Sequence, residues 1–198
     1  MIVRPSDGAT LVGMFHHVAL ATRDTAATHD FYTRVMGFEL VKVVTSATPD
    51  GGWSKHFFYG NRDEHGTRTG LIAFWELHDD KIGTEFPVDI NASAGLPWWV
   101  NHLAFDAPTL EFLHDRRDHW RACGHHVLEI DHEFCISIYL RDPSDNMVEF
   151  CHSVRDFTDD EILHAQELLA DPDPPLEKNA KVTVWEPLSP ASASSPTG

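Results

Sequence analysis

The alternation of apolar and polar positions along the chain predicts the first of two similar halves. Residues 15–21 (FHHVALA) alternate and then run on apolar, which is typical of a half-buried strand. The next segment has an apolar face at helical spacing, a capping residue at Asp24 or Thr25, and Gly37 just beyond its end. Three further strands are expected in this half, at residues 38–45, 53–60 and 69–77.

The second half repeats this order of elements. Residues 100–106 (VNHLAFD) predict its first strand, and the helix that begins around Pro108 is expected to end at Gly124. Each half is therefore β-α-β-β-β, and the expected fold class is α+β with two paired modules. The last three strands of this half are expected at residues 125–130, 134–141 and 146–150.

Sequence outside the two modules predicts one more helix and several connections. The stretch after Phe157 is helical in pattern, and Thr158 and Glu161 have capping-box spacing. The last residues are rich in Pro, Ser and Ala, which is typical of flexible chain. The expected parts are an N-terminal extension (1–13), a first module (14–78), a connecting loop (79–99), a second module (100–152), a C-terminal helix (153–175) and a flexible tail (176–198).

Charge and cysteine content exclude several classes of partner. The 198 residues carry a formal charge of −16, so polyphosphates and anionic membrane surfaces would be repelled, and no nucleic-acid or membrane partner is expected. Three cysteines without a C-x-x-C pair do not form a disulfide framework and indicate a reducing compartment. No signal-like start or long apolar run is evident, so we expect a cytoplasmic location.

Two histidines and one glutamate predict a metal site. Successive side chains on a strand point to opposite faces, so only one of His16 and His17 can enter a shared interior. Aligning the two halves (HVAL with HLAF) gives His17 and His102 equivalent positions on equivalent strands. Glu149 lies between Val148 and Phe150 on the last strand, and a metal would compensate the cost of burying its carboxylate.

Two imidazoles and one carboxylate form the facial triad that suits Fe(II) and leaves coordination positions open. Mn(II), Ni(II) and Zn(II) are chemically acceptable alternatives. Taken singly, a strand histidine is more often a structural residue, and a strand glutamate is more often a surface residue. The internal repeat favours metal ligation over these structural roles, because it identifies both histidines by their equivalent positions and not by their residue type.

The paired modules, together with HHVAL, DFYTRVMGFEL, NHLAF and YLRDPSDNMVEF, resemble the vicinal oxygen chelate superfamily. This superfamily includes glyoxalase I, fosfomycin-resistance proteins, methylmalonyl-CoA epimerase, bleomycin-resistance proteins and extradiol dioxygenases. The resemblance covers about residues 14–152. It implies a cupped mixed sheet around a metal held by His17, His102 and Glu149, and association as a homodimer.

One stretch is similar to the signature of extradiol ring-cleavage dioxygenases. It runs from Ile130-Asp131-His132 through Tyr139 to Glu149 and departs from the signature at Asp145, where Gly or Pro is usual. The resemblance implies that His132 and Tyr139 line the active site. His132 would act as general base and later as acid, while the Tyr139 hydroxyl would stabilise charge on the substrate oxygens.

The expected function is therefore that of a non-haem Fe(II)-dependent extradiol-type dioxygenase that cleaves a catecholic or related aromatic substrate with O2. A glyoxalase- or epimerase-type isomerase or lyase would need a fourth protein ligand, and the equivalent position falls on Ala73 or Phe74, with Glu76 nearby. A fosfomycin-type transferase would need a Lys/Arg cluster. A metal-free drug-binding module remains an alternative, with a pocket lined by aromatic side chains at Trp53, Phe57, Trp98 and Trp99.

Overall fold

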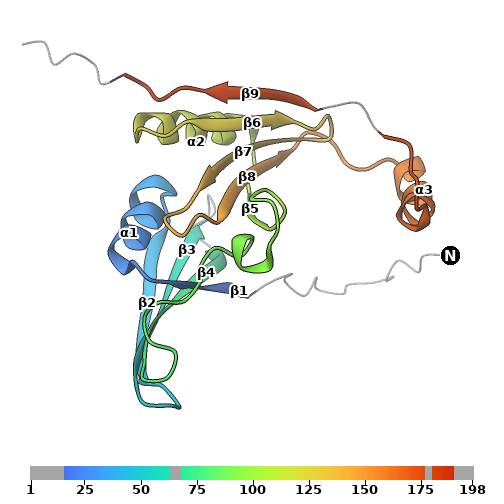
Figure 1. Ribbon diagram of the computed structural model, residues 1–198. Coiled ribbons are helices and arrows are strands. Elements are labelled where there is room, and N and C mark those ends of the chain that lie inside the picture. The colour runs from blue at the N-terminus through green and yellow to red at the C-terminus, as the bar shows by residue number, and fades with distance from the viewer. Residues whose placement is uncertain (1–15, 63–67, 177–179, 190–198) are drawn as a thin grey trace, which may run out of the picture. The chain divides into compact units, whose positions relative to one another are not determined.

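The computed structural model describes residues 16–62, 68–176 and 180–189 (Figure 1). They divide into two compact units, each built on one mixed β-sheet. The first unit holds residues up to Thr25 together with Gly37–Phe86, and the second holds Ala26–Met36 together with the chain from Pro87 onward. The predicted N-terminal extension, residues 1–13, lies outside the described residues.

The sheet of the first unit has four strands in the order β1-β4-β3-β2, with β1 parallel to β4 and the other pairs antiparallel. One face of this sheet is buried, and its core includes Phe57, Tyr59 and Phe74. Gly52 begins the third strand at φ +92°, where a Cβ would lie 1.9 Å from the His78 carbonyl oxygen, so only glycine fits there. The strands are β1 (His17–Thr22), β2 (Glu39–Ala47), β3 (Gly52–Arg62) and β4 (Arg68–Asp79).

The sheet of the second unit repeats this arrangement and adds one strand. Its order is β5-β8-β7-β6-β9, with β5 parallel to β8 and the other pairs antiparallel. The predicted α+β repeat is therefore confirmed, since the first four strands of each sheet have the same order and directions. The strands are β5 (His102–Asp106), β6 (Val127–Asp131), β7 (Cys135–Arg141), β8 (Met147–Ser153) and β9 (Lys181–Trp185).

In the part of the chain that the structure describes, three α-helices form where the apolar spacing and capping residues predict them. Thr109 caps α2 by accepting a hydrogen bond from the Phe112 N–H (3.1 Å). Thr158 and Glu161 form the predicted capping box of α3. The helices are α1 (Thr25–Asp30), which continues as a π-helical turn η1 (Phe31–Val35), α2 (Leu110–Ala122) and α3 (Asp159–Ala170).

The first helix differs from the expectation that residues 14–78 form one continuous module. Residues 26–36 belong to the second unit, where the Trp120 indole N–H donates to the Val35 carbonyl oxygen (3.1 Å). The buried Tyr32 hydroxyl donates to the Asp142 carboxylate (3.0 Å) in the same unit. An apolar helix face shows that the helix is covered, but the pattern does not identify which sheet covers it.

The predicted connecting loop, residues 79–99, contains one short 3-10 turn, η2 (Ala92–Ala94). Asn91 is buried at its centre and donates through Nδ2 to the carbonyl oxygens of Trp98 (2.9 Å) and Asn101 (2.8 Å). The Asn101 N–H donates back to the Asn91 side chain (2.8 Å). These bonds fix the end of the loop directly before β5, the strand that carries His102.

The expectation of a flexible tail over residues 176–198 was wrong for Lys181–Trp185. These residues form β9, which pairs antiparallel with β6 and lies at the edge of the sheet (Figure 1). The Trp185 indole donates to Glu129 (3.1 Å), and the Arg117 guanidinium lies 4.2 Å from its ring centroid. Four residues of KVTVW have good strand propensity (Val182, Thr183, Val184 and Trp185), but the Pro, Ser and Ala around them give this segment the composition of flexible chain. Residues 190–198 lie outside the described residues.

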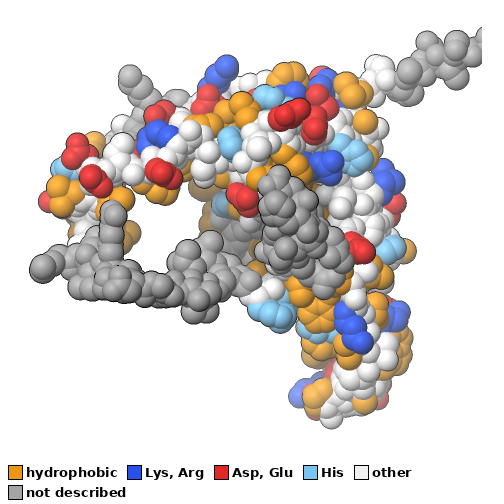
Figure 2. Space-filling view, turned by 180° about the vertical axis from the view of Figure 1, so that it is seen from behind, with side chains coloured by type: hydrophobic (Ala, Val, Ile, Leu, Met, Phe, Trp, Pro, Cys, Tyr) orange, Lys and Arg blue, Asp and Glu red, His pale blue; other side chains and the backbone are white. Residues whose placement is uncertain are grey.

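The surface of the described chain carries charges of both signs. On the face shown in Figure 2, acidic and basic side chains are interspersed with apolar ones. No helix among the described residues has the length and apolar character needed to cross a membrane.

Replacement of Trp185 by alanine should lower the free energy of unfolding of the second unit. The substitution removes a half-buried indole, its bond to Glu129 and its contact with Arg117, at a cost of about 1–3 kcal/mol. Urea unfolding followed by circular dichroism measures the loss, and amide exchange along β6 should accelerate. Val184→Ala is the control on the same strand, since Val184 is 60% exposed and should change stability little. Equal stability of the Trp185 variant and the wild type would contradict the assigned packing of β9.

Candidate metal and catalytic site

One face of the second sheet carries His102, Tyr139 and Glu149. Glu149 on β8 pairs directly with Tyr139 on β7 and with Ala104 on β5, so these side chains share a face. His102 precedes Ala104 by two positions and therefore lies on that face as well. The opposite face forms the core, where Phe150 packs against Trp120 of α2 (ring centroids 5.5 Å apart).

The His102 imidazole and the Glu149 carboxylate are in direct contact. Nε2 of His102 lies 3.2 Å from Oε2 of Glu149, and Glu149 is only 4% exposed while His102 is exposed. Nδ1 of His102 lies 3.3 Å from the Val100 carbonyl oxygen, to which it can donate. A neutral imidazole that carries its proton on Nε2 donates to Oε2 of Glu149. An unprotonated Nε2 and this carboxylate oxygen are close enough to act as two ligands of one divalent ion.

Tyr139 lies beside His102, and its hydroxyl lies close to the His132 ring. The Tyr139 hydroxyl and Nε2 of His132 are 3.3 Å apart, and the Tyr139 ring lies 6.4 Å from the His102 ring, centroid to centroid. Burial raises the pKa of Tyr139, and the neighbouring negative charge of Glu149 raises it further. Tyr139 is therefore a phenol at neutral pH and can donate a hydrogen bond.

His132 occupies the tight turn between β6 and β7. Its backbone N–H donates to the Cys135 carbonyl oxygen (2.9 Å), which closes the turn. The next residue, Glu133, has φ +76°, a left-handed conformation that is uncommon for residues other than glycine. The structure thus brings together four of the five predicted site residues in one unit: His102, His132, Tyr139 and Glu149.

The fifth predicted residue, His17, belongs to the first unit. Its ring lies 5.5 Å from the Phe58 ring and 6.1 Å from the His56 ring, both measured between centroids. His16 precedes β1, so strand alternation does not govern its direction, and its Nδ1 lies 2.8 Å from Nδ1 of His17. Among the described residues, no three His, Cys, Asp or Glu side chains form a cluster that could hold a metal ion.

The strand registers identify the counterpart of Glu149 in the first half. Ala104 pairs with Glu149 in the second sheet, and Ala19 pairs with Ala73 in the first. Ala19 follows His17 by two positions, as Ala104 follows His102, so the two histidines occupy equivalent positions. Ala73 therefore stands where Glu149 stands in the other half.

Glu76 does not replace a ligand at that position. It lies three residues beyond Ala73 and hence on the opposite face of β4. There its carboxylate accepts bonds from Thr25 Oγ1 (2.7 Å), Lys55 Nζ (2.9 Å) and the His78 ring (2.8 Å). Burial by itself would raise the pKa of Glu76, but the hydrogen bonds from His78, Lys55 and Thr25 lower it to about 2.

His56 is a candidate that the sequence analysis missed. It pairs with Trp75 and therefore shares the face of Ala73 and His17. Its ring stacks on Trp75 (3.9 Å between centroids, 12° between planes), and its buried Nε2 has no hydrogen-bond partner among the described residues. Burial, and then the neighbouring His17, lower the pKa of His56, so the ring is neutral at pH 7. An alignment of the two halves would have identified β3, the strand of His56, as the counterpart of β7, the strand of Tyr139. Phe58 on β3 occupies the position equivalent to Tyr139 on β7.

Comparisons with known proteins bear on most of the chain. Residues 14–150 match the model of the Glyoxalase/Bleomycin resistance protein/Dioxygenase superfamily. No curated protein matches the sequence.

Similar solved structures include lactoylglutathione lyase from Agrobacterium tumefaciens, which is 18% identical, with 72% of this chain and 96% of that chain covered and a TM-score of 0.46. A variant of the fosfomycin resistance protein FosX from Listeria monocytogenes, complexed with Mn(II) and a dihydroxypropylphosphonic acid, is 17% identical, with coverage of 77% and 99% and a TM-score of 0.48. An antibiotic-binding protein from a Streptomyces species is 11% identical, with coverage of 73% and 98% and a TM-score of 0.45.

The structural likenesses are distant, whereas the family model spans both β-α-β-β-β halves and every predicted site residue. The chain therefore belongs to the glyoxalase/bleomycin resistance protein/dioxygenase superfamily.

Proposed function

We propose that this chain is an extradiol-type dioxygenase that uses Fe(II) and O2 to cleave a catecholic or related aromatic substrate. The observation that carries the proposal is the grouping of His102, Glu149, Tyr139 and His132 in one unit. A metal-ligating pair, a phenol and a second imidazole are the groups that catechol deprotonation and oxygen chemistry require.

In this proposal the metal ligands are His17, His102 and Glu149. The contact between Nε2 of His102 and Oε2 of Glu149 supports two of them, since a nitrogen and a carboxylate oxygen 3.2 Å apart are close enough to bind one divalent ion. His17 is supported by its equivalence to His102 in the repeat. Fe(II) on two imidazoles and a carboxylate would supply a Lewis acid with open positions for two catechol oxygens and O2; Mn(II), Ni(II) and Zn(II) suit the same ligands less specifically.

His132 and Tyr139 then carry the proton chemistry. Nε2 of His132 accepts a proton from a catechol hydroxyl and returns it to the ring-opened product. The Tyr139 hydroxyl, which burial keeps protonated, donates a hydrogen bond to the substrate oxygen on which negative charge develops. The 3.3 Å separation between these two groups allows both to reach one substrate oxygen.

The isomerase or lyase alternative has less support. A glyoxalase-type centre would use a fourth protein ligand from the last strand of the first half, and Ala73 offers no donor there. Glu76 lies on the opposite face and is engaged with Lys55, Thr25 and His78. We further propose that the enzyme acts as a homodimer on a small molecule.

Oxygen consumption tests the proposed activity directly. The protein is reconstituted anaerobically with Fe(II) and mixed with a panel of catechols, and we expect O2 uptake accompanied by a yellow ring-opened product. Tight metal binding without O2 uptake would transfer support to the isomerase or lyase, with methylglyoxal–glutathione hemithioacetal as the next substrate. Absence of metal binding, with retention of an aromatic ligand, would instead support a drug-binding module.

Removal of one metal ligand should abolish stoichiometric binding of the metal. We expect His17→Ala, His102→Ala and Glu149→Ala each to weaken Fe(II) or Mn(II) affinity by more than about 100-fold, because two remaining ligands hold a divalent ion poorly. Anaerobic isothermal titration calorimetry measures the affinity. Glu76→Gln is the matched control and should keep full affinity, since its carboxylate lies on the other face of β4. Wild-type affinity in any of the three alanine variants would remove that residue from the ligand set.

Loss of the His132 side chain should slow turnover while the metal stays bound. The expected decrease in kcat for His132→Ala is about 10²-fold or more, as is usual for removal of a general acid/base. Tyr139→Phe should lower kcat by about tenfold or more, because it removes one hydrogen bond to developing charge. Steady-state O2 uptake gives kcat, and metal content is measured on the same samples. His126→Ala is the control, because His126 is an exposed histidine paired with Glu186 just before β6. Unchanged turnover in His132→Ala would refute its role.

A further inference from the structure

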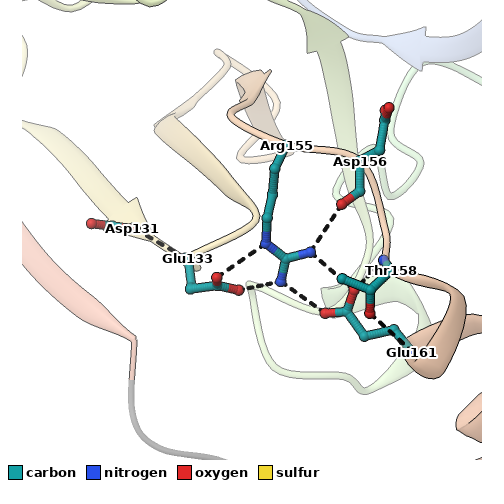
Figure 3. Close-up of polar contacts among 6 residues, drawn as sticks. All are labelled: Asp131, Glu133, Arg155, Asp156, Thr158 and Glu161. Atoms are coloured by element: carbon teal, nitrogen blue, oxygen red, sulfur yellow. Dashed lines mark hydrogen bonds and ion pairs between the residues drawn. The ribbon is translucent and has the colours of Figure 1, made fainter.

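A single guanidinium joins the turn that carries His132 to the start of α3 (Figure 3). Arg155 lies between β8 and α3, and its Nε donates to Oε1 of Glu133 (3.0 Å) while Nη2 donates to the other carboxylate oxygen. Nη1 and Nη2 donate to the two carboxylate oxygens of Glu161 (2.9 and 2.8 Å). Nη1 also donates to the Asp156 carbonyl oxygen (3.0 Å). Five hydrogen bonds therefore match the five N–H donors of the side chain, an arrangement that lysine cannot reproduce.

The turn held by Arg155 has a backbone that its own sequence does not favour. Glu133 has φ +76°, and this left-handed conformation is sterically unfavourable for a residue with a Cβ. The Glu133 N–H donates to the Asp131 carboxylate (2.9 Å), which supports the turn from one side. Arg155 supports it from the other side through the Glu133 carboxylate. His132, directly before Glu133, depends on this turn for the direction of its ring.

The other end of the cluster is fixed to the first turn of α3. Oε2 of Glu161 accepts from the Thr158 N–H (2.6 Å), and Thr158 Oγ1 accepts from the Glu161 N–H (3.2 Å). Hydrogen bonds from Arg155, and then from Thr158, lower the pKa of Glu161 to about 2, so the cluster stays ionised at neutral pH. None of the described residues of α3 is buried, so the helix depends on contacts at its start.

Two contacts beside Arg155 connect the same segments. The Val154 N–H donates to the Phe134 carbonyl oxygen (3.0 Å), and the Phe134 and Phe157 rings lie 5.3 Å apart, centroid to centroid. An isolated surface ion pair contributes little to stability. Here one guanidinium bonds two carboxylates, of which that of Glu161 also accepts from the Thr158 N–H, while the backbone N–H of Glu133 donates to Asp131. The guanidinium therefore restricts geometry even where its net energy is small.

We propose that Arg155 is a positioning residue, which holds His132 against the Tyr139 hydroxyl by joining Glu133 to the start of α3. The consequence for turnover rests on the proposed role of His132 as general acid/base. The positioning itself is a property of the protein alone and can be measured without substrate or metal.

Amide hydrogen exchange in the metal-free, full-length protein measures the positioning. The His132 N–H, which donates to the Cys135 carbonyl oxygen, should exchange about tenfold faster or more in Arg155→Gln and by an intermediate factor in Arg155→Lys. Glu133→Gln should reproduce the acceleration, which keeps the test valid if the Arg155 variants fold poorly. Arg34→Gln is the matched control, because Arg34 on η1 makes a bidentate bond to Asp30, the last residue of α1, and its replacement should leave this amide unchanged. Wild-type exchange at His132 in Arg155→Gln and Glu133→Gln would overturn the proposal.

Kinetics test the catalytic consequence separately. We expect Arg155→Gln to lower kcat by about tenfold with KM within about twofold, and to alter the pH dependence of kcat, because a misplaced imidazole transfers protons less effectively. Arg155→Lys should recover part of the loss. If His132→Ala is inactive while Arg155→Gln keeps the wild-type kcat and pH profile, the positioning role is wrong. If His132→Ala is fully active, the role of His132 in the proposed function fails, and amide exchange alone decides whether Arg155 holds the turn.

Discussion

The buried carboxylate of Glu149 constrains the face of the second sheet that carries His102, Tyr139 and Glu149. A carboxylate removed from water is costly unless charge or hydrogen bonds compensate it, and the neighbours of Glu149 on the adjoining strands are an imidazole and a phenol. His102 on the parallel strand places a ring nitrogen 3.2 Å away, and Tyr139 is the directly paired residue on the antiparallel strand. Because the register fixes all three, a one-residue slip of either strand would move one of them to the core face.

The two halves of the chain share a fold but differ in chemistry at equivalent positions. Ala73 stands in place of Glu149, and Phe58 stands in place of Tyr139, while histidine is kept at both His17 and His102. The first half therefore offers imidazole and aromatic surface, and the second offers the carboxylate and the proton donors. In the proposed site, a single carboxylate would leave more of a metal's coordination sphere to substrate than two would, as the proposed binding of substrate and O2 requires.

Local patterns predicted most of the fold, while the predicted site residues stay a prediction. Alternation and turn residues are local properties, so the strands and helices of both halves were correct to within a few residues. The partner of an apolar helix face is not a local property, and the packing of Trp120 against Val35 could not be read from spacing. Strand β9 was missed because its neighbours have the composition of a flexible tail. His56 was missed because only strand pairing shows which face a residue shares.

Charge on the site face bears on the kind of substrate the proposed enzyme would take. Among the described strand residues of the face that bears His102 and Glu149, Arg141 is the single cation, and it lies 5.0 Å from the Trp98 ring centroid and 3.7 Å from the Asp145 carboxylate. A phosphonate or another dianion would need several donors of that kind, in a protein whose net charge is −16. A catechol arrives neutral and develops negative charge only as it loses protons. In the proposed site, the metal ligands, the Tyr139 phenol and the His132 imidazole would suffice for such a substrate, because its negative charge would develop beside them.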